Sequence, residues 1–119
     1  MVRFDIRPAN QGGYLWRLLS DNNRTMATGA DLSEDRADCL DKLRRAADAA
    51  ASQRPRLVHE DDGTWSWTLY DGDDPVARSA AAYSRRIDCV HAIDRFVELC
   101  GELAPGAADD AVFRPARRR

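Results

Sequence analysis

Two short stretches of alternating apolar and polar residues stand out along the chain and predict two β-strands of similar pattern. Residues 14–18 read Tyr-Leu-Trp-Arg-Leu, and residues 65–69 read Trp-Ser-Trp-Thr-Leu. The aromatic residues and the leucine occupy alternate positions, and a strand places alternate side chains on one face. The two stretches lie 51 residues apart, from Trp16 to Trp67. We therefore interpret the chain as two copies of one small unit, each built around such a strand.

The residues around each of these strands predict two further strands and a following helix. Alternating apolar positions and Gly, Asn and Asp turns predict strands at residues 2–7, 14–19, 24–28, 56–60, 64–70 and 76–79. Apolar residues at helical spacing predict one helix after Ser33, ending near residue 52, and another after Ser84, ending near residue 103. Each serine is the expected N-cap. The predicted order is strand–strand–strand–helix, twice.

The size of each unit predicts that the two units share one core. A unit of about 50 residues buries too little apolar surface to be stable alone. The expected fold is α+β, with two tandem βββα repeats forming one antiparallel six-stranded sheet and both helices packed on one face. Residues 1–103 would form this single domain, from a repeat at 2–52 and a repeat at 55–103. Residues 104–119 are small, polar and finally basic, and are expected to be a disordered tail.

The doubled aromatic strand, with Phe4 before the first copy and Tyr83-Ser84-Arg85 after the second, resembles the YegP-like proteins, a family of unknown function. The resemblance covers about residues 3–102, including Cys89 and Ile93 of the second helix. It implies two β3-α units in one sheet, with the helices exchanged so that each packs across the other unit's strands. It implies no reaction and no catalytic residues. Leu32-Ser33-Glu34 and Thr68 depart from the family pattern.

Composition and charge exclude several classes of protein. The formal net charge is −2 with 32% charged residues, so no overall field attracts nucleic acid or an anionic membrane. No apolar run is long enough to span a membrane, and the first residues lack the apolar stretch of a signal peptide. We expect a cytoplasmic protein, and the bias toward Arg, Asp and Ala is typical of a GC-rich bacterial genome. Cys39, Cys89 and Cys100 lack the spacing of a disulfide framework or a zinc site.

Two sets of residues are candidates for binding. The sheet face opposite the tryptophans would carry Leu15, Arg17, Leu19 and Arg78 and would meet a protein partner. The start of the second helix would carry Ser84, Arg85 and Arg86, where free N–H groups and two guanidinium groups suit an anion. The alternative for this second set is that both arginines are solvated and pair with Asp74 or Asp88.

Catalysis, a metal and a cofactor find no support in the sequence. His59 and His91 are far apart, and Cys89 and His91 point to different sides of a helix. Trp65, Trp67, Tyr70 and Arg78 would suit base stacking, but a repeated apolar face favours a core. We predict a monomeric, non-enzymatic module of protein interaction or structure. The alternative is a binder of small anions, or weakly of nucleic acid, through the arginines after Ser84.

Overall fold

The chain forms three strands and a helix twice in succession, followed by a short seventh strand. This is a computed structural model, and it describes residues 1–103 and 105–115. The first half contains β1 (Arg3–Pro8), β2 (Tyr14–Leu19), β3 (Thr25–Gly29) and α1 (Arg36–Ser52). The second half contains β4 (Arg56–His59), β5 (Trp65–Asp71), β6 (Asp74–Ser79) and α2 (Arg86–Glu102), and β7 (Val112–Phe113) follows. The predicted order of six strands and two helices is confirmed, and the duplication of one unit stays a prediction.

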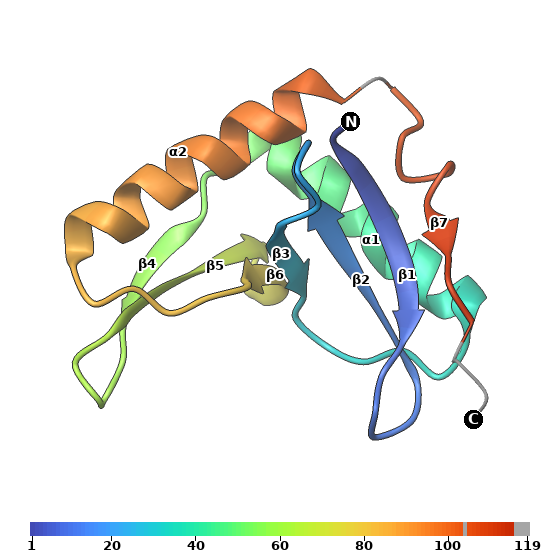
Figure 1. The fold of residues 1–119 in the computed structure, drawn as a ribbon, viewed down its shortest axis with the longest axis horizontal. Helices are drawn as coiled ribbons and strands as arrows, with labels where there is room; N and C mark the ends of the chain where they lie inside the picture. The colour runs from blue at the N-terminus through green and yellow to red at the C-terminus, as the bar shows by residue number, and fades with distance from the viewer. Residues whose placement is uncertain (104, 116–119) are drawn as a thin grey trace.

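All seven strands belong to one sheet, in the order β4-β5-β6-β3-β2-β1-β7. The two halves join at its centre, where β3 and β6 pair antiparallel and Thr28 lies opposite Arg78. β7 pairs with β1 in parallel (Figure 1). The expected six-stranded antiparallel sheet is therefore wrong in its edge, because the sheet is mixed and has seven strands. Two paired residues are too short a strand to produce an alternating sequence pattern.

The C-terminal segment folds back over the first half of the sheet. After α2 the chain descends along the side of β1 (Figure 1), where Ala108 and Ala111 are buried. The Arg114 N–H donates to the Ile6 carbonyl oxygen at 2.8 Å. The expectation of a disordered tail is wrong for residues 105–115, because the free edge of β1 supplies hydrogen-bond partners that composition does not reveal. The rest of that prediction, residues 104 and 116–119, lies outside the described residues.

One face of the sheet and the inner faces of both helices form a single apolar core. Trp16 and Trp67 are 2% and 1% exposed and belong to it. The helices contribute Cys39, Leu43, Ala46, Ala49, Cys89, Ile93, Phe96 and Leu99. These two tryptophans are thus core residues and have no free ring face on which a base could stack. The exchange of helices implied by the family resemblance is wrong, because α1 contacts strands of both halves and α2 contacts β5 of its own half as well as β3.

Both helices begin after the serines that the sequence pattern favours. The N-cap of α1 is Asp35, whose Oδ1 accepts from the Asp38 N–H at 2.8 Å. Ser33 instead forms an antiparallel bridge with Tyr14, through two main-chain hydrogen bonds of 2.8 and 2.9 Å. Tyr83 bridges to Trp65 in the same way, and α2 begins three residues later. These bridges hold the main chain extended, so neither Ser33 nor Ser84 starts a helix.

Close packing of Gly29 against the indole of Trp16 gives a testable prediction. A Cβ at Gly29 would lie 2.7 Å from Trp16 Nε1 and 3.0 Å from Cδ1. Since the ring is itself buried in the core, Gly29→Ala is expected to lower the free energy of unfolding by about 1–3 kcal/mol. Gly101→Ala is the control, because nothing lies within 4 Å of a Cβ there. In the exposed helix interior it should raise stability by about 0.5–1 kcal/mol. Urea denaturation of the two variants measures both changes, and equal effects would contradict the packing argument.

Candidate functional site

The helix-free face of the sheet carries one continuous row of mostly polar residues. Strand register places the members of this row directly opposite one another, in the order Arg56, Thr68, Arg78, Thr28, Arg17, Asp5. Paired residues on neighbouring strands share a face, and their nearest neighbours along each strand point into the core. The row therefore crosses the six antiparallel strands on the side away from both helices. It brings together Arg17 and Arg78, which are far apart in sequence.

Arg17 is held in an ion pair at one end of the row. Its Nε and Nη2 donate to Asp5 Oδ1 and Oδ2 at 2.7 and 3.0 Å. Arg114, just after β7, approaches the same carboxylate at 3.4 Å. The Asp5 side chain is fully buried and that of Arg17 is 18% exposed. Arg17 thus has a structural partner and little guanidinium surface left for a ligand.

The sequence analysis did not identify Asp5 and Arg114 as members of this cluster. Asp5 had a usable signal, because the β1–β2 hairpin register sets it opposite Arg17. Arg114 had no signal, since its position depends on the fold of the C-terminal segment. The two residues connect that segment to the open face of the sheet.

The two leucines predicted on the open face differ in exposure. Leu15 is half-buried and lines a hollow of about 330 Å³ together with Arg17 and Thr28. Leu19 is 1% exposed, so its predicted place on an exposed surface is wrong. The strand register shifts between Leu18 and Leu19, and Leu18, Leu19 and Ser20 are buried in succession. This irregularity ends the alternation on which the prediction relied.

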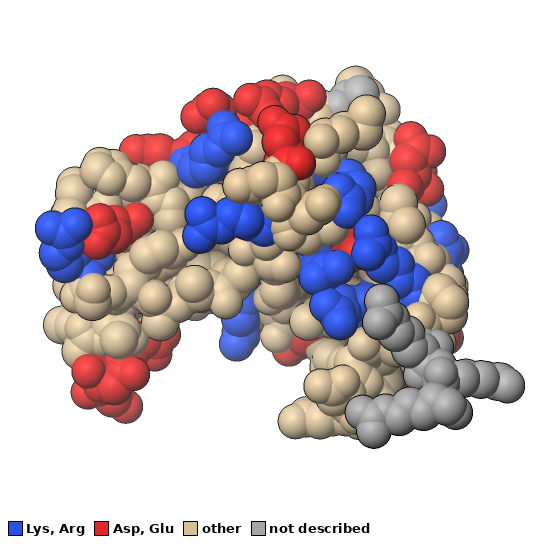
Figure 2. Space-filling view, viewed as in Figure 1, with Lys and Arg blue, Asp and Glu red and all other residues tan. Residues whose placement is uncertain are grey.

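Arg78 lies at the centre of the row and lines the larger hollow of the open face. That hollow measures about 630 Å³ and is also lined by Thr68, Ser66 and residues 60–62 of the β4–β5 hairpin. Arg78 is exposed, and within residues 1–103 and 105–115 its side chain forms no hydrogen bond or ion pair. Figure 2 shows acidic side chains gathered at the tip of this hairpin. The hollow thus combines a free cation, hydroxyl groups and an acidic rim.

The start of α2 differs from the anion site predicted there. Arg85 is the N-cap, and no side chain caps the helix. The Arg85 guanidinium donates to both oxygens of Asp88 at 2.9 and 3.0 Å, and this hydrogen bonding raises the pKa of Arg85. Ser84 and Arg86 are exposed. The predicted pairing with Asp88 is confirmed for Arg85, and it occupies one of the two cations proposed to bind an anion.

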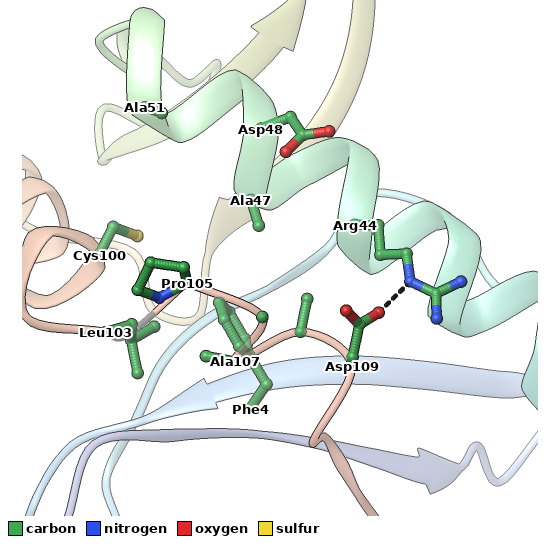
Figure 3. A pocket seen from close by; sticks show the side chains of 12 residues that line it. Phe4, Arg44, Ala47, Asp48, Ala51, Cys100, Leu103, Pro105, Ala107 and Asp109 are labelled. Carbon is green, nitrogen blue, oxygen red and sulfur yellow. Dashed lines mark hydrogen bonds and ion pairs between the residues drawn. The ribbon is translucent and has the colours of Figure 1, made fainter.

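A third hollow, which the sequence analysis did not identify, lies between α1, the end of α2 and the C-terminal segment (Figure 3). It measures about 410 Å³, and its walls are mostly apolar, with Phe4, Ala47, Cys100 and Leu103 among them. At its rim, Arg44 forms an ion pair with Asp109 that fastens the C-terminal segment to α1. A pocket formed by three segments distant in sequence leaves no local pattern.

The cysteines are poor nucleophiles in the folded protein. Burial raises the pKa of Cys100 from 9.0 to about 12, and also raises the pKa of Cys39 and of Cys89. Only the thiolate reacts readily, so the thiolate fraction of Cys100 near neutral pH is roughly a thousandfold smaller than that of a free cysteine. We expect slow reaction of the folded protein with a disulfide reagent, and rapid reaction of all three thiols in guanidinium chloride. Rapid reaction of the folded protein would contradict this.

The same shift predicts a dependence of stability on alkaline pH. In the unfolded chain Cys100 begins to ionise near pH 9, whereas in the folded protein it stays neutral to about pH 12. The free energy of unfolding should therefore fall as the pH rises through this interval. Cys100→Ala should remove the part of this fall that Cys100 contributes.

The histidines and acidic residues do not assemble a metal site in the described ranges. His59 stacks on Trp65 with ring centroids 4.1 Å apart, and His91 is exposed on α2. Within residues 1–103 and 105–115 no group of three or more His, Cys, Asp or Glu side chains is arranged to hold a metal ion. In the same residues no helix has the length and apolar character needed to cross a bilayer.

Solved structures with the same arrangement of strands and helices come from two bacteria. The protein of unknown function yegP from E. coli superimposes with a TM-score of 0.73 at 12% identity, covering 96% of this chain and 91% of that chain. The chain has the YegP-like fold. A UPF0339 protein from Shewanella oneidensis has this fold too, with a TM-score of 0.70 at 9% identity over 96% of this chain and 90% of that one. The resemblance inferred from the sequence is thus confirmed at the level of the YegP-like fold.

By sequence alone, no known family model matches the chain, and no curated protein matches it either. The E. coli protein is described as one of unknown function. The YegP-like fold therefore brings no activity to this chain, and function has to be argued from the surface.

Proposed function

We propose that the protein is a non-enzymatic interaction module that binds a polypeptide partner in the hollow around Arg78 on the helix-free sheet face. The observation that carries this proposal is the free guanidinium of Arg78, exposed at the centre of the polar row. Thr28 and Thr68 lie opposite it on the two neighbouring strands. A carboxylate of a partner would receive charge-assisted hydrogen bonds from Arg78 and weaker ones from the flanking hydroxyl groups.

The charges around the hollow favour a polypeptide over nucleic acid. Glu60, Asp61 and Asp62 line the same hollow as Arg78. A polyanion would meet these carboxylates within a few ångströms of the cation it needs, and like charges at that distance repel. A polypeptide with both acidic and basic side chains can satisfy both signs. Ser66 and Thr64 already donate to Glu60 and Asp62, so the acidic rim has a fixed shape.

Selection of short linear peptides from a random library tests the proposal. We expect peptides that bind the unchanged protein to be enriched in acidic residues and to lose at least tenfold in affinity for Arg78→Glu. Arg86→Glu is the matched control, since it removes an exposed arginine on α2 and should leave this affinity unchanged. Peptides that bind the Arg78→Glu protein as well as the unchanged one would overturn the proposal.

The alternative proposal, an anion bound at the start of α2 by Ser84, Arg85 and Arg86, has weaker support. The bidentate bond between Arg85 and Asp88 would have to open before Arg85 reached an anion. Titration with inorganic phosphate, followed through the amide signals of residues 84–88, separates the two proposals. Saturable shifts there that Arg86→Glu abolishes would support the anion site. A cytoplasmic location and a monomeric state stay predictions, and light scattering of the purified chain checks the second.

A further inference from the structure

The two outer strands of the antiparallel part of the sheet, β1 and β4, are placed equivalently. Ile6 of β1 lies opposite Trp16, and Leu57 of β4 lies opposite Trp67. Each strand is followed by a hairpin and by a bridge that leads into a helix, from Tyr14 to Ser33 and from Trp65 to Tyr83. In each half the helix begins three residues after the bridge. Thus Asp5 corresponds to Arg56, Ile6 to Leu57 and Tyr14 to Trp65.

The outer edge of β1 is occupied, and its occupant shows what such an edge binds. β7 lies parallel to it, with Val112 beside Asp5 and Phe113 beside Ile6. Phe113 packs on the Tyr14 ring at 5.6 Å between centroids, and the Arg36 guanidinium lies 5.6 Å above Phe113. Arg114 then approaches the Asp5 carboxylate. The edge therefore accommodates an extended segment with an apolar residue, an aromatic residue and a residue of charge opposite to Asp5.

The outer edge of β4 has no strand beside it in the part of the chain that the structure describes. The Glu60 N–H donates to the Thr64 carbonyl oxygen within the hairpin. Hydrogen bonding alternates along an antiparallel ladder, so the main-chain groups of His59 and Leu57 point outward. Such an unpaired edge is a ready partner for an extended polypeptide.

We propose that the outer edge of β4 binds an extended segment of a protein partner, parallel to β4, with the pattern apolar–aromatic–acidic. The aromatic residue would lie beside Leu57 and the Trp65 ring, as Phe113 lies beside Ile6 and Tyr14. Arg86 holds the place in α2 that Arg36 holds in α1, so it would lie over that ring. The acidic residue would meet Arg56, which takes the place of Asp5.

Charge excludes the protein's own C-terminal segment as the occupant. If Val112 and Phe113 of a second copy lay along β4, Arg114 would face Arg56, and two like charges at that distance repel. Arg56 lies 4.6 Å from the centre of the Tyr70 ring and is exposed, so it keeps donors for a carboxylate. The partner is thus a segment from another protein that carries Glu or Asp at this position.

Two synthetic peptides test the proposal on the full chain: residues 109–115 as they stand, and the same peptide with Arg114→Glu. We expect the Arg114→Glu peptide to bind at least tenfold more tightly and to shift the amide signals of residues 56–59 and 65. In the Arg56→Glu protein this preference should reverse. Equal binding of the two peptides, a preference that does not reverse, shifts confined to residues 5 and 6, or no binding at all would each overturn the proposal. Arg78→Glu should leave this binding unchanged, which separates it from the function proposed for the open face.

Discussion

Trp67→Ala is expected to lower the free energy of unfolding by about 3–5 kcal/mol, the usual cost of emptying a buried tryptophan site. The Trp67 side chain is 1% exposed and packs against Phe96 of α2 with ring centroids 4.5 Å apart. Removing it would leave a cavity between the sheet and the helix that neither element can close alone. Urea denaturation followed by circular dichroism measures the loss.

Two further variants make the Trp67 experiment specific. Trp65 lies on the same strand but is only partly buried, against His59, so Trp65→Ala should cost less than half as much. Trp67 Nε1 has no hydrogen-bond partner among the residues the structure describes. A buried N–H without a partner costs about 1–3 kcal/mol, so Trp67→Phe recovers that amount against the atoms it removes. Trp67→Phe should therefore remain close to the unchanged protein. A loss as large as that of Trp67→Ala would contradict this.

Asp5→Ala is expected to cost a comparable amount, about 3–5 kcal/mol, because it leaves a largely buried cation without its partner. The Asp5 carboxylate is fully buried and accepts two hydrogen bonds from Arg17. Chemical denaturation measures the change. Arg114→Ala is the comparison, since this arginine is 51% exposed and 3.4 Å from the same carboxylate. An exposed partner of this kind contributes about 0–1 kcal/mol.

Changing both members of the Asp5–Arg17 pair tests the cause of the loss. Replacing Asp5 by leucine and Arg17 by methionine together removes both charges and keeps much of the volume. Because the cost comes from an unpaired buried charge, this double variant should regain most of the stability that Asp5→Ala loses. If the double variant were as unstable as the sum of the two single changes, the charge explanation would be wrong.

The alternation around Trp16 and Trp67 was sufficient to predict the strands and the side of the sheet that forms the core. Buried strands in an antiparallel sheet need apolar side chains at every second position, so the sequence had to display that pattern. The helices were predictable for the same reason, from Leu43 and Ile93 at helical spacing. Their first residues were less so, because Ser33 looks like a cap but its main chain pairs with Tyr14.

The candidate site was predicted only in part. Arg17 and Arg78 were placed correctly on the helix-free face, since each follows or precedes a core position by one residue. Which of the two is free could not be read from the sequence. Arg17 is neutralised by Asp5 across the hairpin, whereas Arg78 faces threonines on both sides. Leu19 was predicted wrongly because a register shift ends the alternation at that point.

The sequence by itself determined the number of long strands, both helices, the core face and the likeness to the YegP-like fold, because each rests on a local period of apolar residues. Only the tertiary structure decided how the C-terminal segment ends. β7 pairs with β1, and Arg114 reaches Asp5, through contacts between residues more than a hundred positions apart. Two residues of strand and one charge carry no period. Their place depends on the free edge that the rest of the fold presents, and this is also why the edge of β4, which lacks such a cover, becomes visible only in three dimensions.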